Sequence, residues 1–180
     1  MPYTDILSRV ADAMDGGAPI KARRTRPEPE APTAESSAKW TLQGFGPMTR
    51  IATSFGDVHA QALRERDMIR THHGNLKAIK WVDRVMLDRA FLAKVSDATA
   101  IMIRANALGK GLPKADVVVS PQQEVGIGSH GANIKYQRAY TLLGRPGVIH
   151  KPEEIMTYTM FHCGEPVCVK MEGLWARVSP

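Results

Sequence analysis

Thiol and imidazole side chains are the groups through which this sequence could most readily do chemistry. Its two cysteines, Cys163 and Cys168, lie close together, and His162 directly precedes the first. Such groups can act as nucleophile and base, or bind zinc, for which Cys-x-x-Cys or His-x-x-x-His spacing is typical. Neither spacing occurs here, even when the further histidines His59, His72 and His73 are included. We therefore expect no metal site, no cofactor and two ordinary thiols in strands.

The elements that would position these residues are mostly short strands. From Trp40 onward, segments rich in β-branched and apolar residues alternate with turn signals, which predicts a mainly β domain over residues 41–180. The pattern predicts three hairpins, with turns at 54–57, 72–75 and 163–166. It also predicts strands over 101–103 and 116–120, and a short helix over 133–143.

The first 40 residues have a different composition. Apolar residues recur at helical spacing over residues 3–15, and Gly16-Gly17 would end such a helix. The predicted apolar stripe consists of Tyr3, Ile6, Leu7, Val10 and Met14. Residues 18–40 are rich in proline, alanine, serine and charge, which is typical of an extended tether. We therefore expect a docking helix over 1–17, a linker over 18–40 and one domain over 41–180.

Residues 44–53 (Gly-Phe-Gly-Pro-Met-Thr-Arg-Ile-Ala-Thr) carry the most specific signal. They resemble the Cys-Phe-x-x-Gly-Thr-x-Ile-x-Thr opening of bacterial Hint domains, the Hedgehog/intein family. Residues 78–84, 103–113 and 116–122 resemble later motifs of the same family in the same order, so the resemblance covers about residues 44–175. It implies a Hint-like horseshoe of short strands and hairpins.

The resemblance also implies that the reactive groups have been replaced. Gly44 stands where the family has its cysteine nucleophile, and Gln123 stands where a Ser/Thr-x-x-His motif places the acid–base imidazole. Glycine cannot attack a carbonyl, and a carboxamide does not titrate near neutral pH. The two threonines that flank position 44, Thr41 and Thr49, lie outside the register of the nucleophile.

A further family motif near the C-terminus, Tyr-x-His-x-x-x-Asp-x-His, falls on residues 158–166. This alignment puts Met160, Gly164 and Pro166 at the polar positions, whereas a shift of two residues would bring His162 into the site.

Length and composition restrict the class of protein. The chain has 180 residues, 43% of them hydrophobic, enough for one domain with a sizeable core. No run of 18 apolar residues occurs, and the N-terminus lacks the pattern of a secretory signal, so we expect a cytoplasmic protein without a membrane partner. The net charge is +6, and all of this excess belongs to residues 41–180.

These features together predict a non-catalytic Hint-like domain that acts as a structural or protein-interaction module in a larger assembly. Residues 1–40 would bind the protein partner, with Arg23, Arg24 and Arg26 adding electrostatic attraction. The alternative is slow self-cleavage at the Gln43-Gly44 bond. A third interpretation, nucleic-acid binding through the basic surface, is less favoured because only 6% of the residues are aromatic and could stack on bases.

Overall fold

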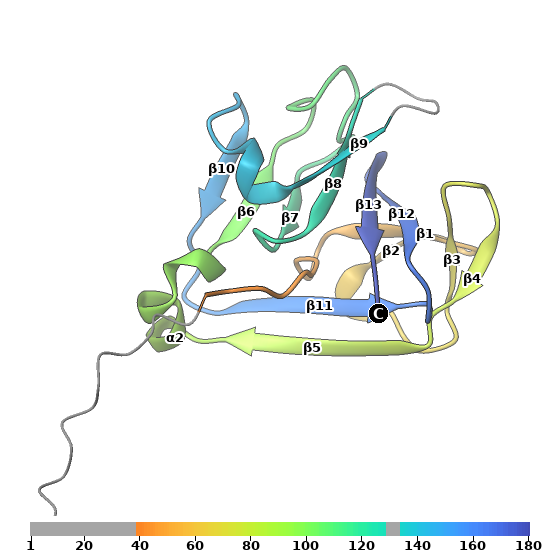
Figure 1. The fold of residues 1–180 in the computed structure, drawn as a ribbon, viewed down its shortest axis with the longest axis horizontal. Coiled ribbons are helices and arrows are strands. Elements are labelled where there is room, and N and C mark those ends of the chain that lie inside the picture. The colour runs from red at the N-terminus through yellow and green to blue at the C-terminus, as the bar shows by residue number, and fades with distance from the viewer. Residues whose placement is uncertain (1–38, 129–133) are drawn as a thin grey trace, which may run out of the picture. The chain divides into compact units, whose positions relative to one another are not determined.

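The computed structural model describes residues 39–128 and 134–180 (Figure 1). The predicted docking helix and the linker up to residue 38 lie outside the described residues. The strands are β1 (Arg50–Thr53), β2 (Gly56–His59), β3 (Met68–Arg70), β4 (Leu76–Ala78), β5 (Trp81–Leu87), β6 (Ala100–Ile103), β7 (Val117–Val119), β8 (Glu124–Ile127), β9 (Lys135–Arg138), β10 (Val148–Lys151), β11 (Met156–His162), β12 (Val167–Met171) and β13 (Leu174–Val178). The helical turns are η1 (Ala60–Ala62), α2 (Arg89–Lys94), η2 (Ser96–Ala98) and η3 (Ala139–Leu142). The prediction of a mainly β domain is confirmed.

The strands of the described residues form three sheets. The largest has the order β4-β3-β1-β12-β13-β8-β9, with β2 also paired to β1; the others are β10-β6-β7 and the two-stranded ribbon β11-β5. Figure 1 shows this ribbon as a long antiparallel pair, with the segment that enters the domain running beside β11. Strands that are distant in the sequence therefore meet around the start of the domain.

Two of the three predicted hairpins are present. β1 pairs with β2, and β3 pairs with β4. In the first turn, Thr53 Oγ1 accepts a hydrogen bond from the Phe55 N–H (3.1 Å) and donates to the Gly56 carbonyl (2.8 Å). Gly56 has a φ of +107°, which glycine adopts without strain.

The third predicted hairpin is wrong, although its two strands exist. β11 pairs with β5 along its whole length, from Met156↔Leu87 to His162↔Trp81. β12 pairs instead with β13 and β1. The turn between β12 and β13 is the dipeptide Glu172-Gly173, with φ angles of +44° and +90°. Two positive φ values are what a tight two-residue hairpin turn needs, so this turn, and not residues 163–166, closes the hairpin.

The predicted helix over 133–143 is also wrong in part. Residues Lys135–Arg138 form β9, which pairs with β8, and only Ala139–Leu142 turn helically as η3. Tyr136 and Gln137 are half-buried on this strand. Pairing with β8 satisfies the backbone groups of the segment, and a helix there would forgo those bonds.

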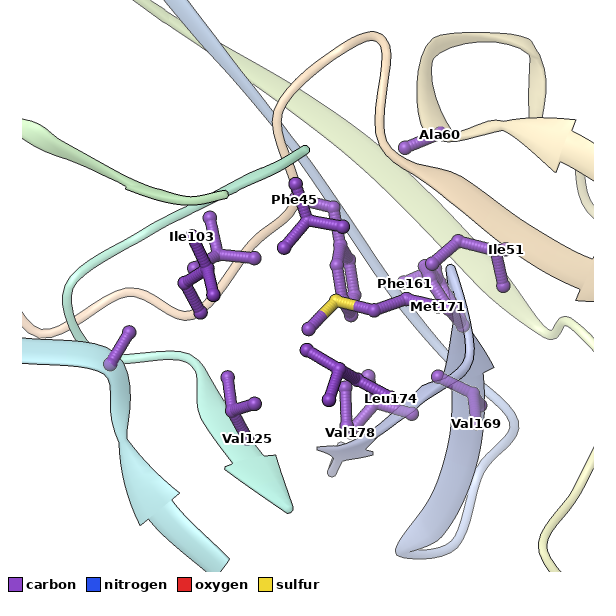
Figure 2. Packing of buried hydrophobic residues seen from close by; sticks show 14 of the residues in the cluster. Phe45, Ile51, Ala60, Ile103, Val125, Phe161, Val169, Met171, Leu174 and Val178 are labelled. Carbon is purple, nitrogen blue, oxygen red and sulfur yellow. The ribbon is translucent and has the colours of Figure 1, made fainter. Parts of the chain in front are cut away.

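The larger hydrophobic core lies among all three sheets. In Figure 2 the Met171 side chain reaches toward the centre of this cluster, with Phe45, Ile103, Val125 and Val178 around it. The rings of Phe45 and Phe161 stack with their centroids 5.5 Å apart. The residue that follows Gly44 is thus one of the central core residues, 1% exposed, and fixes the position of the segment that carries it.

A second, smaller cluster lies beside α2. Its members are Trp40, Leu87, Ala98, Ala100, Met156 and Tyr158. Trp40 contacts the rings of both Tyr158 and Phe91. The chain is therefore anchored at Trp40, the last residue of the predicted linker, before the first strand begins.

Candidate functional site

The chain around Gly44 is held between β7 and β11. The Phe45 N–H donates to the Thr159 carbonyl and the Thr159 N–H donates to the Phe45 carbonyl, each over 2.9 Å. On the other side, the Ser120 N–H donates to the Gly44 carbonyl (2.9 Å) and the Gly46 N–H to the Val118 carbonyl (2.7 Å). These bonds fix the backbone on both sides of residue 44.

Ser120 also holds the residues that precede Gly44. Its Oγ accepts a hydrogen bond from Trp40 Nε1 (2.9 Å) and donates to the Leu42 carbonyl (2.5 Å). Ser120 is fully buried, so these bonds are shielded from solvent. Among the residues that the structure describes, no hydrogen bond involves the Gln43 carbonyl or the Gly44 N–H. The Gln43-Gly44 peptide bond is therefore held in place through its neighbours.

A cleft of about 420 Å³ lies at this peptide bond. Its walls are Thr41, Leu42, Gln43, Gly44, Phe45, Trp81, Gln123, Met160, Phe161, His162, Val178, Ser179 and Pro180. Gly44 and Gln123, which are far apart in the sequence, thus line the same cleft, in agreement with the resemblance. Met160 and His162 line it as well, whereas Gly164 and Pro166 do not.

Position 44 leaves little room for a side chain. A Cβ atom on Gly44 would lie 3.0 Å from the Tyr158 Cβ and 3.4 Å from the Met160 Cγ. The neighbouring hydroxyls do not compensate for the missing thiol. Thr49 is buried, and its Oγ1 donates to the Val118 carbonyl over 2.7 Å, whereas Thr41 is exposed on the wall of the cleft.

Gln123 is a fully buried residue that ties two strands together. Its Nε2 donates to the carbonyl of Arg177 (2.8 Å) and, over a longer distance, to the carbonyl of Glu124 (3.2 Å). Its Oε1 is buried and has no hydrogen-bond partner within the described part of the chain. The side chain thus connects the start of β8 to the end of β13 and supplies no titrating group to the cleft.

His162 is the imidazole that the cleft contains. The Gly164 N–H donates to its Nδ1 over 3.1 Å, and its ring stacks on that of Trp81 at 5.4 Å between centroids. Because Nδ1 accepts a hydrogen bond, the neutral ring carries its proton on Nε2. The alignment shifted by two residues was thus the signal that pointed to His162.

The other cysteine and histidine candidates lie away from this cleft. Cys163 is buried and Cys168 half-buried, and both are free thiols. Burial raises the pKa of Cys163, and the nearby Glu165 raises it further. The rings of His72 and His73 lie edge to face at the tip of the β3–β4 hairpin. Within residues 39–128 and 134–180, no three His, Cys, Asp or Glu side chains group as metal ligands would.

Comparison with known families gives a match to the Hint domain over residues 43–177. The chain belongs to the Hint-domain family. A search of curated proteins finds no match. Among solved structures, this Hint domain is similar to the gp41-1 intein, with 8% identity, a TM-score of 0.46 and coverage of 76% of this chain and 98% of the intein. It is also similar to a GSH-linked, splice-inactive variant of the AceL NrdHF class 3 split intein, with 12% identity, a TM-score of 0.40 and coverage of 76% and 97%.

The partner-binding residues predicted for this Hint-domain protein remain a prediction. The apolar stripe from Tyr3 to Met14 and the basic residues Arg23, Arg24 and Arg26 all lie outside the described residues. No helix in the described part of the chain has the length and apolar character needed to cross a membrane.

Proposed function

We propose that this Hint domain does not process its own chain and acts as a structural or protein-interaction module of a larger assembly. The observation that carries the first half of the proposal is the environment of Gly44. The residue has no nucleophilic atom, and a Cβ there would come within 3.0 Å of the Tyr158 Cβ. Gln123, which lines the same cleft, uses its amide to hold the Arg177 carbonyl. Both reactive positions therefore serve packing and hydrogen bonding.

The fixed entry of the chain supports the second half of the proposal. Trp40 is packed among buried residues and donates a hydrogen bond to Ser120. A partner bound to the residues before Trp40 would therefore be connected to a rigid part of the domain. The tether predicted over residues 18–40, apart from the packed Trp40 at its end, would raise the effective concentration of the domain at any partner that binds residues 1–17. A short apolar stripe could then recruit the whole domain with modest affinity of its own.

Recruitment tests the proposal in the full-length chain. The variant Leu7→Asp/Val10→Asp places two charges in the predicted stripe, and it should lose the bound protein in a pull-down from cell extract followed by mass spectrometry. The matched control is Thr4→Asp/Ser8→Asp, which adds the same charge outside the stripe and should retain the partner. Replacing Arg23, Arg24 and Arg26 together by Gln should weaken recovery mainly at low salt.

The opposite pattern would contradict this function. If both double variants recover the same partner as the unaltered chain, residues 1–17 do not dock through the stripe. If the unaltered chain recovers no specific protein from its native extract, the domain is not a module of a stable assembly.

Slow cleavage of the Gln43-Gly44 bond is the second candidate, and His162 is the observation that favours it. Among the described residues that line the cleft, His162 is the one imidazole, and its neutral form carries a proton on Nε2 of the kind that a departing amide nitrogen needs. In this hydrolysis water would add to the Gln43 carbonyl while the departing Gly44 nitrogen takes the proton, which would release residues 1–43 and would be lost in His162→Ala. The absence of a nucleophile at position 44 makes us prefer the non-catalytic function.

A further inference from the structure

A second cavity, separate from the cleft at Gly44, lies where five chain segments meet. Its volume is about 530 Å³, within the range of roughly 300–1,000 Å³ that is typical of small-molecule sites. The lining residues are Lys39, Ser96, Asp97, Thr99, Pro121, Gln122, Arg138, Tyr140, Leu143 and His150. None of them lines the cleft at Gly44. This cavity therefore has no part in the site described above.

The charges on the cavity wall are unequal. Lys39 and Arg138 are formal cations and His150 adds an imidazole, whereas Asp97 is the one carboxylate among the described residues of the lining. Within the described part of the chain, no ion pair includes Lys39, Arg138 or Asp97. The charges of Lys39 and Arg138 are thus not neutralised by an ion pair with a described residue. An anion in the cavity would be attracted to them.

Three uncharged polar side chains of the wall also have no hydrogen-bond partner among the described residues. The side chains of Ser96, Thr99 and Tyr140 make no hydrogen bond to the described residues, in contrast to Ser120 and Thr49, which hold backbone groups elsewhere in the domain. Pro121, Leu143 and the exposed ring of Tyr140 add an apolar side to the cavity. A wall of this kind offers hydrogen bonds, a positive region and a flat surface at once.

From this combination we propose that the cavity binds a phosphate monoester attached to a ring system with hydroxyl or amino groups, of the size of a nucleoside monophosphate. The guanidinium of Arg138 and the ammonium of Lys39 suit a phosphate, because both are charge-assisted donors and the guanidinium can bind two oxygens at once. Asp97 accepts hydrogen bonds only, so it suits the hydroxyl or amino groups of the ligand. The ring of Tyr140 gives the ring system a surface to pack against.

The test is a titration of the full-length protein, labelled with nitrogen-15, with three probes: adenosine monophosphate, adenosine and inorganic phosphate. Saturable shifts at the backbone amides of residues 96–99, 122 and 138–143 are expected with the monophosphate. Weaker binding by at least about tenfold is expected with either of the other two, because each lacks half of the recognised chemistry. Equal affinity for the monophosphate and for adenosine, or for the monophosphate and inorganic phosphate, would overturn the proposal.

Variants locate the binding. Arg138→Gln should weaken binding of the monophosphate about tenfold or more, because it removes a charge-assisted contact. Arg145→Gln changes an exposed arginine outside the lining and should stay within about twofold of the unaltered chain. If Arg138→Gln unfolds, Lys39→Gln provides the second test, since Lys39 is exposed and lies before the first strand. Shifts that lie outside this cavity, or that survive both variants, would contradict the assignment.

Discussion

The side-chain amide of Gln123 donates a hydrogen bond to the carbonyl of Arg177 over 2.8 Å. The two residues are 54 positions apart, and the bond joins the chain before β8 to the end of β13. The motif resemblance predicts that Gln123 stands where related Hint domains have an acid–base histidine. In this chain the Gln123 side chain is buried and connects two strands, so replacing it should reduce the stability of the fold.

Gln123→Ala should lower the free energy of unfolding by about 1–3 kcal/mol, because it removes the hydrogen bond to the Arg177 carbonyl and empties the volume of a fully buried side chain. Urea unfolding measured by circular dichroism gives this value. The control is Gln61→Ala, an exposed position whose loss should cost less than about 0.5 kcal/mol. An equal cost at both positions would contradict a structural role for Gln123.

Alanine at the two glycines that open the domain should have graded effects. A Cβ on Gly46 would lie 2.8 Å from the Val118 Cβ and 3.0 Å from its carbonyl oxygen, whereas a Cβ on Gly44 would lie 3.0 Å from the Tyr158 Cβ. Gly46→Ala should therefore cost about 1–3 kcal/mol, and Gly44→Ala about 1 kcal/mol or less. Thermal unfolding of both variants measures the order. A larger cost at Gly44 than at Gly46 would mean that the packing around the entry segment is different.

The ion pair of Lys77 and Glu165 predicts a small dependence of stability on acid pH. Lys77 Nζ lies 2.7 Å from Glu165 Oε1 and lowers the pKa of that carboxyl group. A lowered pKa in the folded state means that the contribution is present above the unfolded pKa of roughly 4.3 and is lost as the pH falls through the folded value. The stability difference between the unaltered chain and Glu165→Gln should therefore close below about pH 4.

Salt and a second carboxylate serve as controls for that prediction. Both partners are exposed, so the difference should be small and should shrink in about 0.5 M NaCl. Glu65→Gln, at an exposed carboxylate outside every ion pair of the described residues, should show no such closing gap. A gap that widens as the pH falls would have the wrong sign.

The two thiols should differ in reactivity. Burial raises the pKa of Cys163, which is 4% exposed, whereas Cys168 is half-buried. Since the thiolate is the reactive form, iodoacetamide at neutral pH should label Cys168 first and Cys163 only slowly. Peptide mass spectrometry over time measures the two rates, and Cys168→Ser should leave a chain that labels slowly until it is unfolded in urea. Faster labelling of Cys163 would contradict its burial.

Local sequence patterns predicted the elements better than their partners. The hairpins β1–β2 and β3–β4 follow from turn residues such as Gly56, because these strands pair with their neighbours in the chain. The pairing of β11 with β5 joins strands more than 60 residues apart. The alternation of apolar and polar residues along a strand indicates which face is buried, but it does not indicate which distant strand is the partner. The turn Glu172-Gly173 was a usable hairpin signal, and it would have corrected the third prediction.

The candidate site was predictable only in part for a similar reason. Gly44 and Gln123 follow from motifs that the family keeps in order, and both line the cleft. The part of His162 depended on the alignment of the C-terminal family motif, which the sequence left open by two residues, and the structure places His162 opposite Trp81 on the wall of the cleft. The role of Ser120, which holds Trp40 and Leu42, required the folded arrangement because no local spacing links these residues.

The most direct test of the account is the fate of the Gln43-Gly44 bond. The full-length protein is incubated with dithiothreitol at neutral pH over several days, and its intact mass is followed beside that of His162→Ala. We expect the full chain alone in both samples, because position 44 supplies no nucleophile and Gln123 supplies no acid. A fragment of residues 1–43 that accumulates in the unaltered chain and not in His162→Ala would contradict the account and establish cleavage by the cleft.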